Sequence, residues 1–154
     1  MLRDARVVDA LPNHVISLSE RLREQDREEI WAAFHFTPYE ALNMSYETSA
    51  LRWTVLLDDL PIIMFGAAPI AVLGGGVPWM LASPEIEQIK YKFVRQSREY
   101  VQLMEGEFPH LENYVDARNT VSINWLKWCG FTVCPAAPFG IEQLPFHRFY
   151  KGGA

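Results

Sequence analysis

The sequence predicts an α/β fold in which helices flank a central mixed, mostly antiparallel sheet. Three observations support this prediction. Residues 51–82 contain three strand-like segments separated by turns, a long amphipathic helix follows them, and further strands and a helix complete the chain. Because a long helix between two neighbouring strands makes a crossover connection, part of the sheet should be parallel. Nothing repeats and no low-complexity linker interrupts the chain, so we expect one domain over residues 1–154.

The first 50 residues favour one short strand followed by helices. Arg6–Val8 is the strand-like segment, and Ser17–Phe34 carries apolar residues at helical spacing between charged ones. This region can divide into two helices within the charge-rich stretch Arg21–Glu29. Thr37-Pro38 is a favourable helix start, because threonine caps the amino end and proline fits the first turn, and the helix should run to about Glu47.

The middle of the chain has the pattern of an antiparallel meander. Leu51–Leu57 and Ile62–Ala67 are rich in apolar and β-branched residues, and Asp58–Pro61 forms a turn between them. Three glycines, Gly74–Gly76, break the chain before a third strand, Val77–Ala82. A glycine run can also bind phosphate, but this one precedes a strand and has no Lys-Ser/Thr pair after it, so we interpret it as a hairpin turn.

The second half of the chain alternates helices and strands. Ser83 and Pro84 begin the clearest helix, and Glu85 and Glu87 complement the positive end of its dipole. Apolar residues recur at helical spacing as far as Met104. The remaining elements are a strand over Asn113–Ala117, a helix over Thr120–Trp128, a strand over Phe131–Val133 and a last strand within Ile141–Tyr150.

Composition and charge argue against several classes of protein. The net charge is −5 and the pI is near 5.3, so we expect no nucleic-acid partner. The longest apolar stretch, Leu60–Leu73, is broken by proline and glycine and is too short to span a bilayer. The first residues lack an apolar signal core, so we expect a cytoplasmic protein with no membrane partner. Cys129, Cys134 and the scattered histidines do not form a metal motif, so we expect no metal.

The segment Asn119–Phe131 resembles the carboxyl-terminal signature of the GNAT acyltransferases. In that family an asparagine begins a helix, a small residue follows three positions later, and the helix ends in Gly-Phe before a strand. Asn119, Ser122, Gly130 and Phe131 fall at those spacings. The asparagine can cap a helix, the serine permits close packing, and the glycine permits a left-handed helix end. The order of elements is similar to GNAT over nearly the whole chain, which implies a GNAT-like acyl-CoA N-acyltransferase fold.

Three further segments carry a narrower resemblance. Trp79–Ser83, Ser97–Arg98 and Asn113–Asn119 are similar to segments of small GNAT-like proteins of tailed phages. Some of those proteins are acetyltransferases and others are internal virion proteins. This resemblance implies a phage-encoded protein in the host cytoplasm or in the virion.

The GNAT resemblance also implies a site for acetyl-CoA. In these enzymes two central strands part and the acyl-CoA arm lies in the gap, which here falls between Val77–Ala82 and Asn113–Ala117. Backbone amides of the first strand would pair with the pantetheine and polarise the thioester carbonyl, and the start of the following helix would hold the pyrophosphate. The residues assigned to the cofactor on this basis are Met80, Leu81, Ala82, Ser83, Gln88 and Asn119.

Two departures from the family pattern predict a degenerate cofactor site. The usual glycine-rich phosphate loop is replaced by Ser83–Gln88, in which Pro84 lacks an amide donor and Glu85 and Glu87 bring negative charge towards the phosphates. Many GNAT enzymes protonate the departing thiolate with a tyrosine at the position that Leu126 occupies here. Leucine cannot donate a proton.

Candidate catalytic residues follow from the same resemblance. Tyr114 is assigned as the replacement acid, with Tyr100 as the alternative. A general base is expected where the second helix meets the first strands, and Glu47 is the preferred candidate. His35, Tyr39 and Tyr46 lie in the same region.

The resemblance implies transfer of an acetyl group from acetyl-CoA to an amine on a protein or a small molecule. The degenerate site favours an alternative, in which a non-catalytic protein of the same fold acts as a virion component or binds host proteins. A sensor that binds acyl-CoA is a third interpretation. A homodimer is left open.

Overall fold

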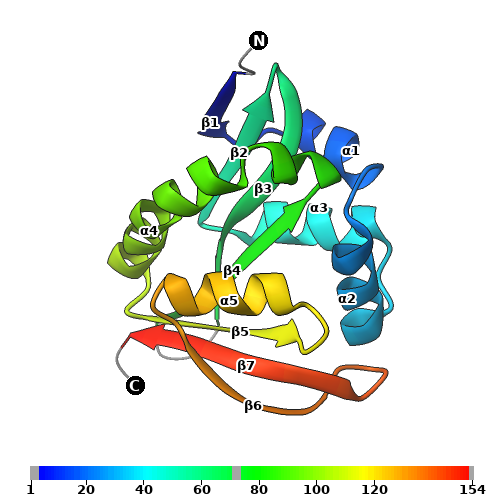
Figure 1. Cartoon of the computed structure of the whole chain (residues 1–154), viewed down its shortest axis with the longest axis vertical. Coiled ribbons are helices and arrows are strands. Elements are labelled where there is room, and N and C mark those ends of the chain that lie inside the picture. Colours follow the sequence, from blue (N-terminus) through cyan, green and yellow to red (C-terminus); the bar gives the residue numbers. More distant parts are fainter. Residues whose placement is uncertain (1–3, 71–73, 153–154) are drawn as a thin grey trace.

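One mixed seven-stranded sheet organises the computed structural model, which describes residues 4–70 and 74–152 (Figure 1). The strands are β1 (Ala5–Asp9), β2 (Leu51–Leu57), β3 (Leu60–Pro69), β4 (Gly75–Ala82), β5 (His110–Asp116), β6 (Thr132–Phe139) and β7 (Leu144–Gly152). Their order is β1-β2-β3-β4-β5-β7-β6, and every neighbouring pair is antiparallel except β4–β5. The predicted mixed, mostly antiparallel sheet is confirmed. Its parallel pair, β4 and β5, is connected by the long helix, as predicted. Of the three glycines predicted to form a turn, Gly74 does so with a φ of 70°, whereas Gly75 and Gly76 already belong to β4.

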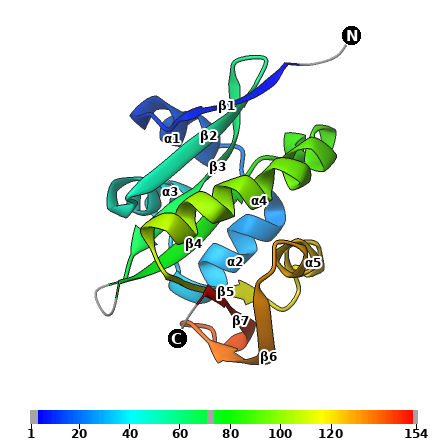
Figure 2. The same ribbon diagram turned by 90° about the vertical axis from the view of Figure 1, so that its left-hand side faces the viewer.

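Helices cover both faces of the sheet. They are α1 (Pro12–Ser19), α2 (Glu24–Phe34), α3 (Pro38–Thr48), α4 (Lys90–Glu107) and α5 (Thr120–Trp128), with a 3-10 helix, η1, over Pro84–Gln88. Helices α1 and α3 pack on β3, whereas α4 and α5 lie on the opposite face, against β5 and β6 (Figures 1 and 2). In residues 4–70 and 74–152, no helix has both the length and the apolar character needed to cross a membrane.

The helices before β2 follow the sequence pattern with one difference. Helix α1 begins at Pro12, ahead of the predicted start at Ser17, and the predicted break lies just before Glu24, where α2 begins. The start of α3 is as predicted, because the Thr37 Oγ1 accepts from the Glu40 N–H at 3.1 Å and the Glu40 Oε1 accepts from the Thr37 N–H at 3.0 Å. This reciprocal capping box satisfies two amides that the helix itself leaves unpaired.

The helix predicted from Ser83 is interrupted after one short 3-10 helix. Ser83 makes no side-chain cap, and Pro84–Gln88 forms the 3-10 helix before α4 starts at Lys90. The backbone of Ser83 continues from β4, with its N–H donating to the Ile62 carbonyl of β3 at 2.8 Å, and the non-helical Ile89, whose φ is −127°, separates the 3-10 helix from α4. The prediction of one continuous, serine-capped helix is therefore wrong.

The last two strands form a longer hairpin than the pattern predicted. Strand β6 extends to Phe139 although it contains Pro135 and Pro138. Proline has no N–H to donate, but β6 is an edge strand with β7 as its one neighbour, and the register shifts between Val133 and Ala136. The prolines explain why the predicted strand ended at Val133.

Alternate residues of the central strands supply two apolar layers, one on each face. On β3, Ile63 and Phe65 belong to the core beneath α4 and α5, whereas Met64 belongs to the core beneath α1–α3. On β4, Leu81 belongs to the α1–α3 core and Met80 packs against the other one. This follows from the two-residue repeat of a strand. The sheet therefore separates two apolar layers, and an opening in it connects them.

Candidate active site in the split between β4 and β5

Strands β4 and β5 pair only where they begin. Gly75 and Gly76 pair with His110 and Leu111 in parallel, and then the strands diverge (Figure 1). Glycine is needed at Gly76, because a Cβ atom there would lie 2.6 Å from the ring of Phe108. A split of the kind implied by the GNAT resemblance is thus present at the centre of the sheet.

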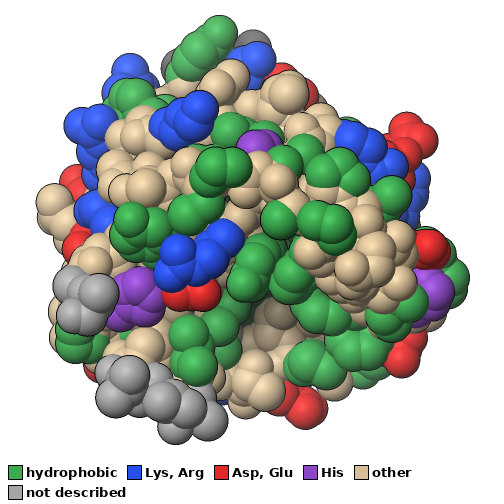
Figure 3. All heavy atoms as spheres, turned by 90° about the horizontal axis from the view of Figure 1, so that it is seen from below, with side chains coloured by type: hydrophobic (Ala, Val, Ile, Leu, Met, Phe, Trp, Pro, Cys, Tyr) green, Lys and Arg blue, Asp and Glu red, His purple; other side chains and the backbone are tan. Residues whose placement is uncertain are grey.

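A cavity of about 530 Å³ occupies the split and reaches both faces of the sheet. Its walls include Ile30 and Met44 from the α2–α3 side and Tyr100 and Trp125 from the α4–α5 side. None of the described residues that line it is a lysine, arginine or histidine, and the described ranges contain no cluster of Cys, His, Asp and Glu able to hold a metal ion. Seen from below, the surface has a hollow around which hydrophobic side chains gather (Figure 3).

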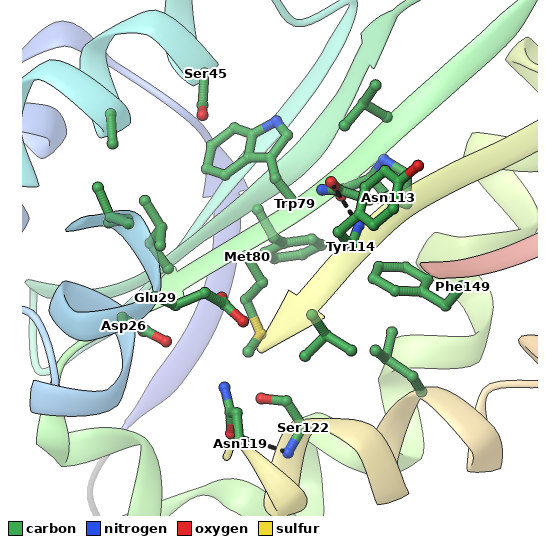
Figure 4. Close-up of a pocket in the computed structure, with 18 of the residues that line it drawn as sticks. Asp26, Glu29, Ser45, Trp79, Met80, Asn113, Tyr114, Asn119, Ser122 and Phe149 are labelled. Atoms are coloured by element: carbon green, nitrogen blue, oxygen red, sulfur yellow. Dashed lines mark hydrogen bonds between the residues drawn. The ribbon is translucent and has the colours of Figure 1, made fainter. Parts of the chain in front are cut away.

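Hydrogen bonds along β4 show which of its amides face the split. The Ser83 N–H donates to Ile62 of β3 at 2.8 Å. Because backbone direction alternates along a strand, the Leu81 N–H also points to β3. The Met80 and Ala82 amides point the opposite way, towards β5. Figure 4 shows Met80 near the middle of the cavity.

Asn113 spans the narrow end of the split. Its Nδ2 donates to the Pro78 carbonyl of β4 at 2.8 Å, and its Oδ1 accepts from the Tyr114 N–H of β5 at 2.8 Å. One side chain therefore satisfies a backbone group on each of the diverging strands. The backbone nitrogen of Pro78 is on the side of β4 that faces the split. Its lack of a proton therefore costs the β3–β4 ladder no hydrogen bond.

The amino end of α2 occupies the wide end of the split beside β4. The Asp26 Oδ2 accepts from the Ala82 N–H at 2.9 Å, and the Arg23 N–H donates to the Ala82 carbonyl at 2.8 Å. Arg23 also holds the Asp26 carboxylate through Nε at 3.1 Å and Nη2 at 2.9 Å. Both side chains are buried, and burial raises the pKa of Asp26 while the Arg23 guanidinium opposes that rise. Both split-facing backbone groups of Ala82 are therefore already bonded.

Glu29 extends from α2 into the split towards Met80 (Figure 4). Its Oε1 accepts from the Asp116 N–H of β5 at 2.6 Å. Desolvation raises the pKa of Glu29 to about 8, and the carboxylates of Asp26 and Asp116 add to the rise. The Asp116 amide and the Arg23 guanidinium act in the opposite direction without cancelling it. Glu29 is therefore mostly protonated at neutral pH.

The two carboxylates of α2 were absent from the predicted site residues. The sequence pattern placed them in a stretch interpreted as a helix break. A signal was nevertheless available, because Asp26 and Glu29 share a helical repeat with Ile30 and Ala33, and residues at these spacings lie on one face of a helix. Two carboxylates on the apolar face of a helix indicate a buried acidic site.

Two of the residues predicted to bind the cofactor through the backbone line the cavity, and one does not. Met80 and Leu81 line it, although the Leu81 N–H is directed to β3. Ala82 is fully buried beside the cavity, and its N–H is bonded to Asp26. Of these three amides, Met80 is the one that reaches the split with no bond among the described residues.

The other predicted cofactor residues lie around the same end of the split. Asn119 caps α5, where its Oδ1 accepts from the Ser122 N–H at 3.3 Å, and both residues line the cavity (Figure 4). Ser83 is buried and its Oγ has no hydrogen-bond partner within the described chain. Gln88 is exposed on η1, outside the cavity lining.

The predicted catalytic residues are also divided between the cavity and the surface. Tyr114 lines the cavity and stacks on Phe139, with ring centroids 4.0 Å apart. Tyr100 and Leu126 line the wall on the α4–α5 side. Glu47 is exposed in the last turn of α3 and is not among the lining residues. The fold therefore brings Tyr114, but not Glu47, to the cavity.

The two glutamates predicted to repel phosphates both have cationic partners. The Glu85 Oε1 lies 3.2 Å from the Arg21 Nη1, and the Glu87 Oε2 lies 3.0 Å from the Lys90 Nζ. These ion pairs reduce the negative charge that η1 presents. They also engage the cationic groups of Arg21 and Lys90.

Solved structures share this fold. No protein-family model matches the sequence, and no curated protein sequence does either. The GNAT-family acetyltransferase from Bacillus anthracis has a TM-score of 0.70 at 11% identity, with 98% of each chain covered. Ard1 from Thermoplasma volcanium has a TM-score of 0.71 at 11% identity, with 96% of each chain covered. Spermidine N-acetyltransferase from Vibrio cholerae, solved with CoA and spermine, has a TM-score of 0.67 at 10% identity and covers 96% of this chain and 94% of its own. The chain therefore has the GNAT acetyltransferase fold.

Proposed function

We propose that the chain transfers an acetyl group from acetyl-CoA to an amine on a protein or a small molecule. The observation that carries this proposal is the Met80 amide, which faces a cavity that passes through the sheet between β4 and β5. A backbone N–H at this position can donate to the thioester carbonyl and stabilise the negative charge that develops on its oxygen. The complex of the Vibrio cholerae enzyme with CoA and spermine supports the same pairing of cofactor and amine.

The cavity fits the acyl-pantetheine part of the cofactor better than its nucleotide part. Apolar walls and the Met80 backbone suit the thioester and the pantetheine arm. The arm would run along β4 towards Ser83 and Gln88, beside the amino end of α5 at Asn119. Because the cavity lining has no cationic side chain, the phosphates would depend on backbone amides and on groups outside the cavity. We therefore propose a weakened cofactor site.

The reaction forms a C–N bond, breaks the C–S bond, takes a proton from the amine and returns one to the thiolate. Tyr114 is the proposed acid and Glu47 the proposed base. Tyr100 is the alternative acid, because it shares with Leu126 the wall on the α4–α5 side. The variants Tyr114→Phe, Tyr100→Phe and Glu47→Gln each test one assignment, since loss of the acid or base lowers kcat by roughly 10²-fold or more.

The proposal is tested through the Met80 amide itself. Met80→Pro removes one N–H that is not part of the β3–β4 ladder, and Pro78 already occupies an equivalent position in the same strand. Acetyl-CoA-dependent release of CoA thiol, measured with a panel of primary amines, should fall about 10²-fold in kcat in this variant. Met80→Leu keeps the amide and is the matched control. Equal rates in the two variants, with both folded by circular dichroism, would exclude the amide from the reaction.

A second candidate is a non-catalytic protein of the same fold. Asp26 already takes the Ala82 amide that a pantetheine arm would need, and Leu126 stands where an acid is expected. The resemblance to internal virion proteins of tailed phages suggests a partner in the virion or in the host. Calorimetric titration of acetyl-CoA separates the candidates, because the absence of heat and of thermal stabilisation at millimolar concentration favours the non-catalytic protein.

A further inference from the structure

We infer that the half of the cavity next to α2 and α3 is a receptor for an aliphatic ammonium group, with the Glu29 carboxylate as its counter-ion. The inference rests on the proposed function, in which an amine is the acceptor. It names the class of that amine: a primary ammonium at the end of an unbranched apolar stem, as in a lysine side chain.

Glu29 is the carboxyl group at this end of the split that lacks a cation. Within the described residues its one hydrogen bond is from the Asp116 N–H to Oε1, at 2.6 Å, and it has no ion pair with a Lys, Arg or His. Arg23 is engaged by both oxygens of Asp26. Arg118 is engaged by Asp116, with Nη2 2.7 Å from Oδ2. An ammonium ion entering the cavity therefore meets an acidic group that the protein itself does not neutralise.

The approach to Glu29 suits an apolar stem. Phe34 and Met44 both line the cavity and are about half exposed, at 50% and 49%, so they stand at its opening on the α2–α3 side. Phe36 and Trp79 continue the wall inwards. Aromatic faces attract cations and apolar walls pack against methylene groups. A bulky or strongly polar body would lose its hydration here without gaining hydrogen bonds.

The charges around Glu29 link ammonium binding to pH. The charged groups that act on it are Arg23 and Asp26 on α2, Asp116 on β5 and Arg118 just after β5, and the described lining residues from α3, β4 and α5 carry no charge. Without a ligand, desolvation raises the pKa of Glu29 to about 8, so the carboxyl must release its proton when an ammonium ion binds. The affinity should therefore rise with pH, by roughly tenfold per unit, and level off above about pH 8.

The test uses butylammonium and its neutral counterpart 1-butanol, titrated calorimetrically into the full chain. Between pH 6.5 and 8.5 the affinity for butylammonium should rise about twentyfold, while the affinity for 1-butanol should not change. Near pH 7, titrations in buffers of different ionisation enthalpy should show release of close to one proton for each butylammonium bound. A pH-independent affinity with no proton release would overturn the inference, and this measurement needs no variant.

A pair of variants on the same helix locates the effect. Glu29→Gln keeps an oxygen to accept from the Asp116 N–H but removes the charge, so the preference for butylammonium over 1-butanol and its pH dependence should both disappear. Glu28→Gln is the control, because Glu28 is exposed and lies 3.9 Å from Arg118. Its titrations should match those of the unmodified chain. Identical behaviour of the two variants would contradict the assignment to Glu29.

Failure of this inference and failure of the proposed function give different results. If butylammonium binds with proton release but no acetyl transfer is detected, the receptor stands and the acetyltransferase proposal falls. If acetyl transfer occurs at the same rate with Glu29→Gln, and the chain does not distinguish butylammonium from 1-butanol, the proposed function stands and the receptor falls.

Discussion

Replacing Glu29 by glutamine should stabilise the fold at neutral and alkaline pH. Folding raises the pKa of the Glu29 carboxyl from 4.5 to about 8, so the folded chain binds this proton more tightly than the unfolded chain. Stability is therefore lost as pH rises from the unfolded value towards the folded one. At about 1.4 kcal/mol per pH unit, the loss at pH 7 is roughly 3 kcal/mol, and it approaches roughly 5 kcal/mol above pH 8.

Glutamine carries no such penalty and keeps the bond to the Asp116 amide. Urea unfolding of both proteins at pH 5, 7 and 8.5 should give nearly equal free energies of unfolding at pH 5 and a difference that grows with pH in favour of Glu29→Gln. The other titrating groups are common to both proteins and cancel in the difference. Glu28→Gln, on the exposed face of the same helix, should show no such trend. If the free energies of unfolding of Glu29→Gln and the unmodified chain differ by less than about 0.5 kcal/mol at all three pH values, the reasoning is refuted. The carboxyl would then be solvated in the folded state.

Two further predictions concern the walls of the split. Asn113→Ala should lower the free energy of unfolding by about 2 kcal/mol, because the Pro78 carbonyl and the Tyr114 N–H lose their partner. Urea unfolding measures this change, and an unchanged midpoint would mean that water replaces the side chain. Leu126→Tyr should raise kcat for acetyl transfer by about tenfold or more if a missing proton donor limits departure of the thiolate. An unchanged kcat, measured by thiol release, would show that protonation of the thiolate is not the slow step.

The elements whose signal lies within a short stretch of sequence could be predicted. The β-branched and apolar runs of β2 and β3 indicated a meander, and the Thr37-Pro38 start of α3 is confirmed by its reciprocal capping bonds. Asn119 caps α5 as its place in the GNAT-like segment implied. In each case a local pattern of two to four residues determines the local structure, so no tertiary information is needed.

The parts that depend on distant partners could not be predicted in this way. Ser83 and Pro84 have the local pattern of a helix start and a 3-10 helix does begin at Pro84, but the non-helical conformation of Ile89 interrupts it and α4 begins only at Lys90. Strand β6 continues through two prolines because it lies at the edge of the sheet, a fact that only the complete strand order reveals. The Asp26–Ala82 bond joins residues 56 positions apart, and no short-range pattern contains it.

Opening a sheet at its centre leaves backbone groups on both edges that must find partners, because an unpaired buried amide costs about 1–3 kcal/mol. Here Asn113 serves both edges at the narrow end, and Asp26 and Glu29 each take one amide at the wide end. Three polar side chains therefore keep the split open without any cofactor. Met80 lies between them with an amide that has no partner among the described residues, and this is the donor that a thioester could use. The same arrangement leaves Glu29 at a high energetic cost when it ionises, and an ammonium ion is the partner that would remove that cost. The pH dependence of stability and the proposed preference for a cationic acceptor thus have a common origin in the Glu29 carboxyl group.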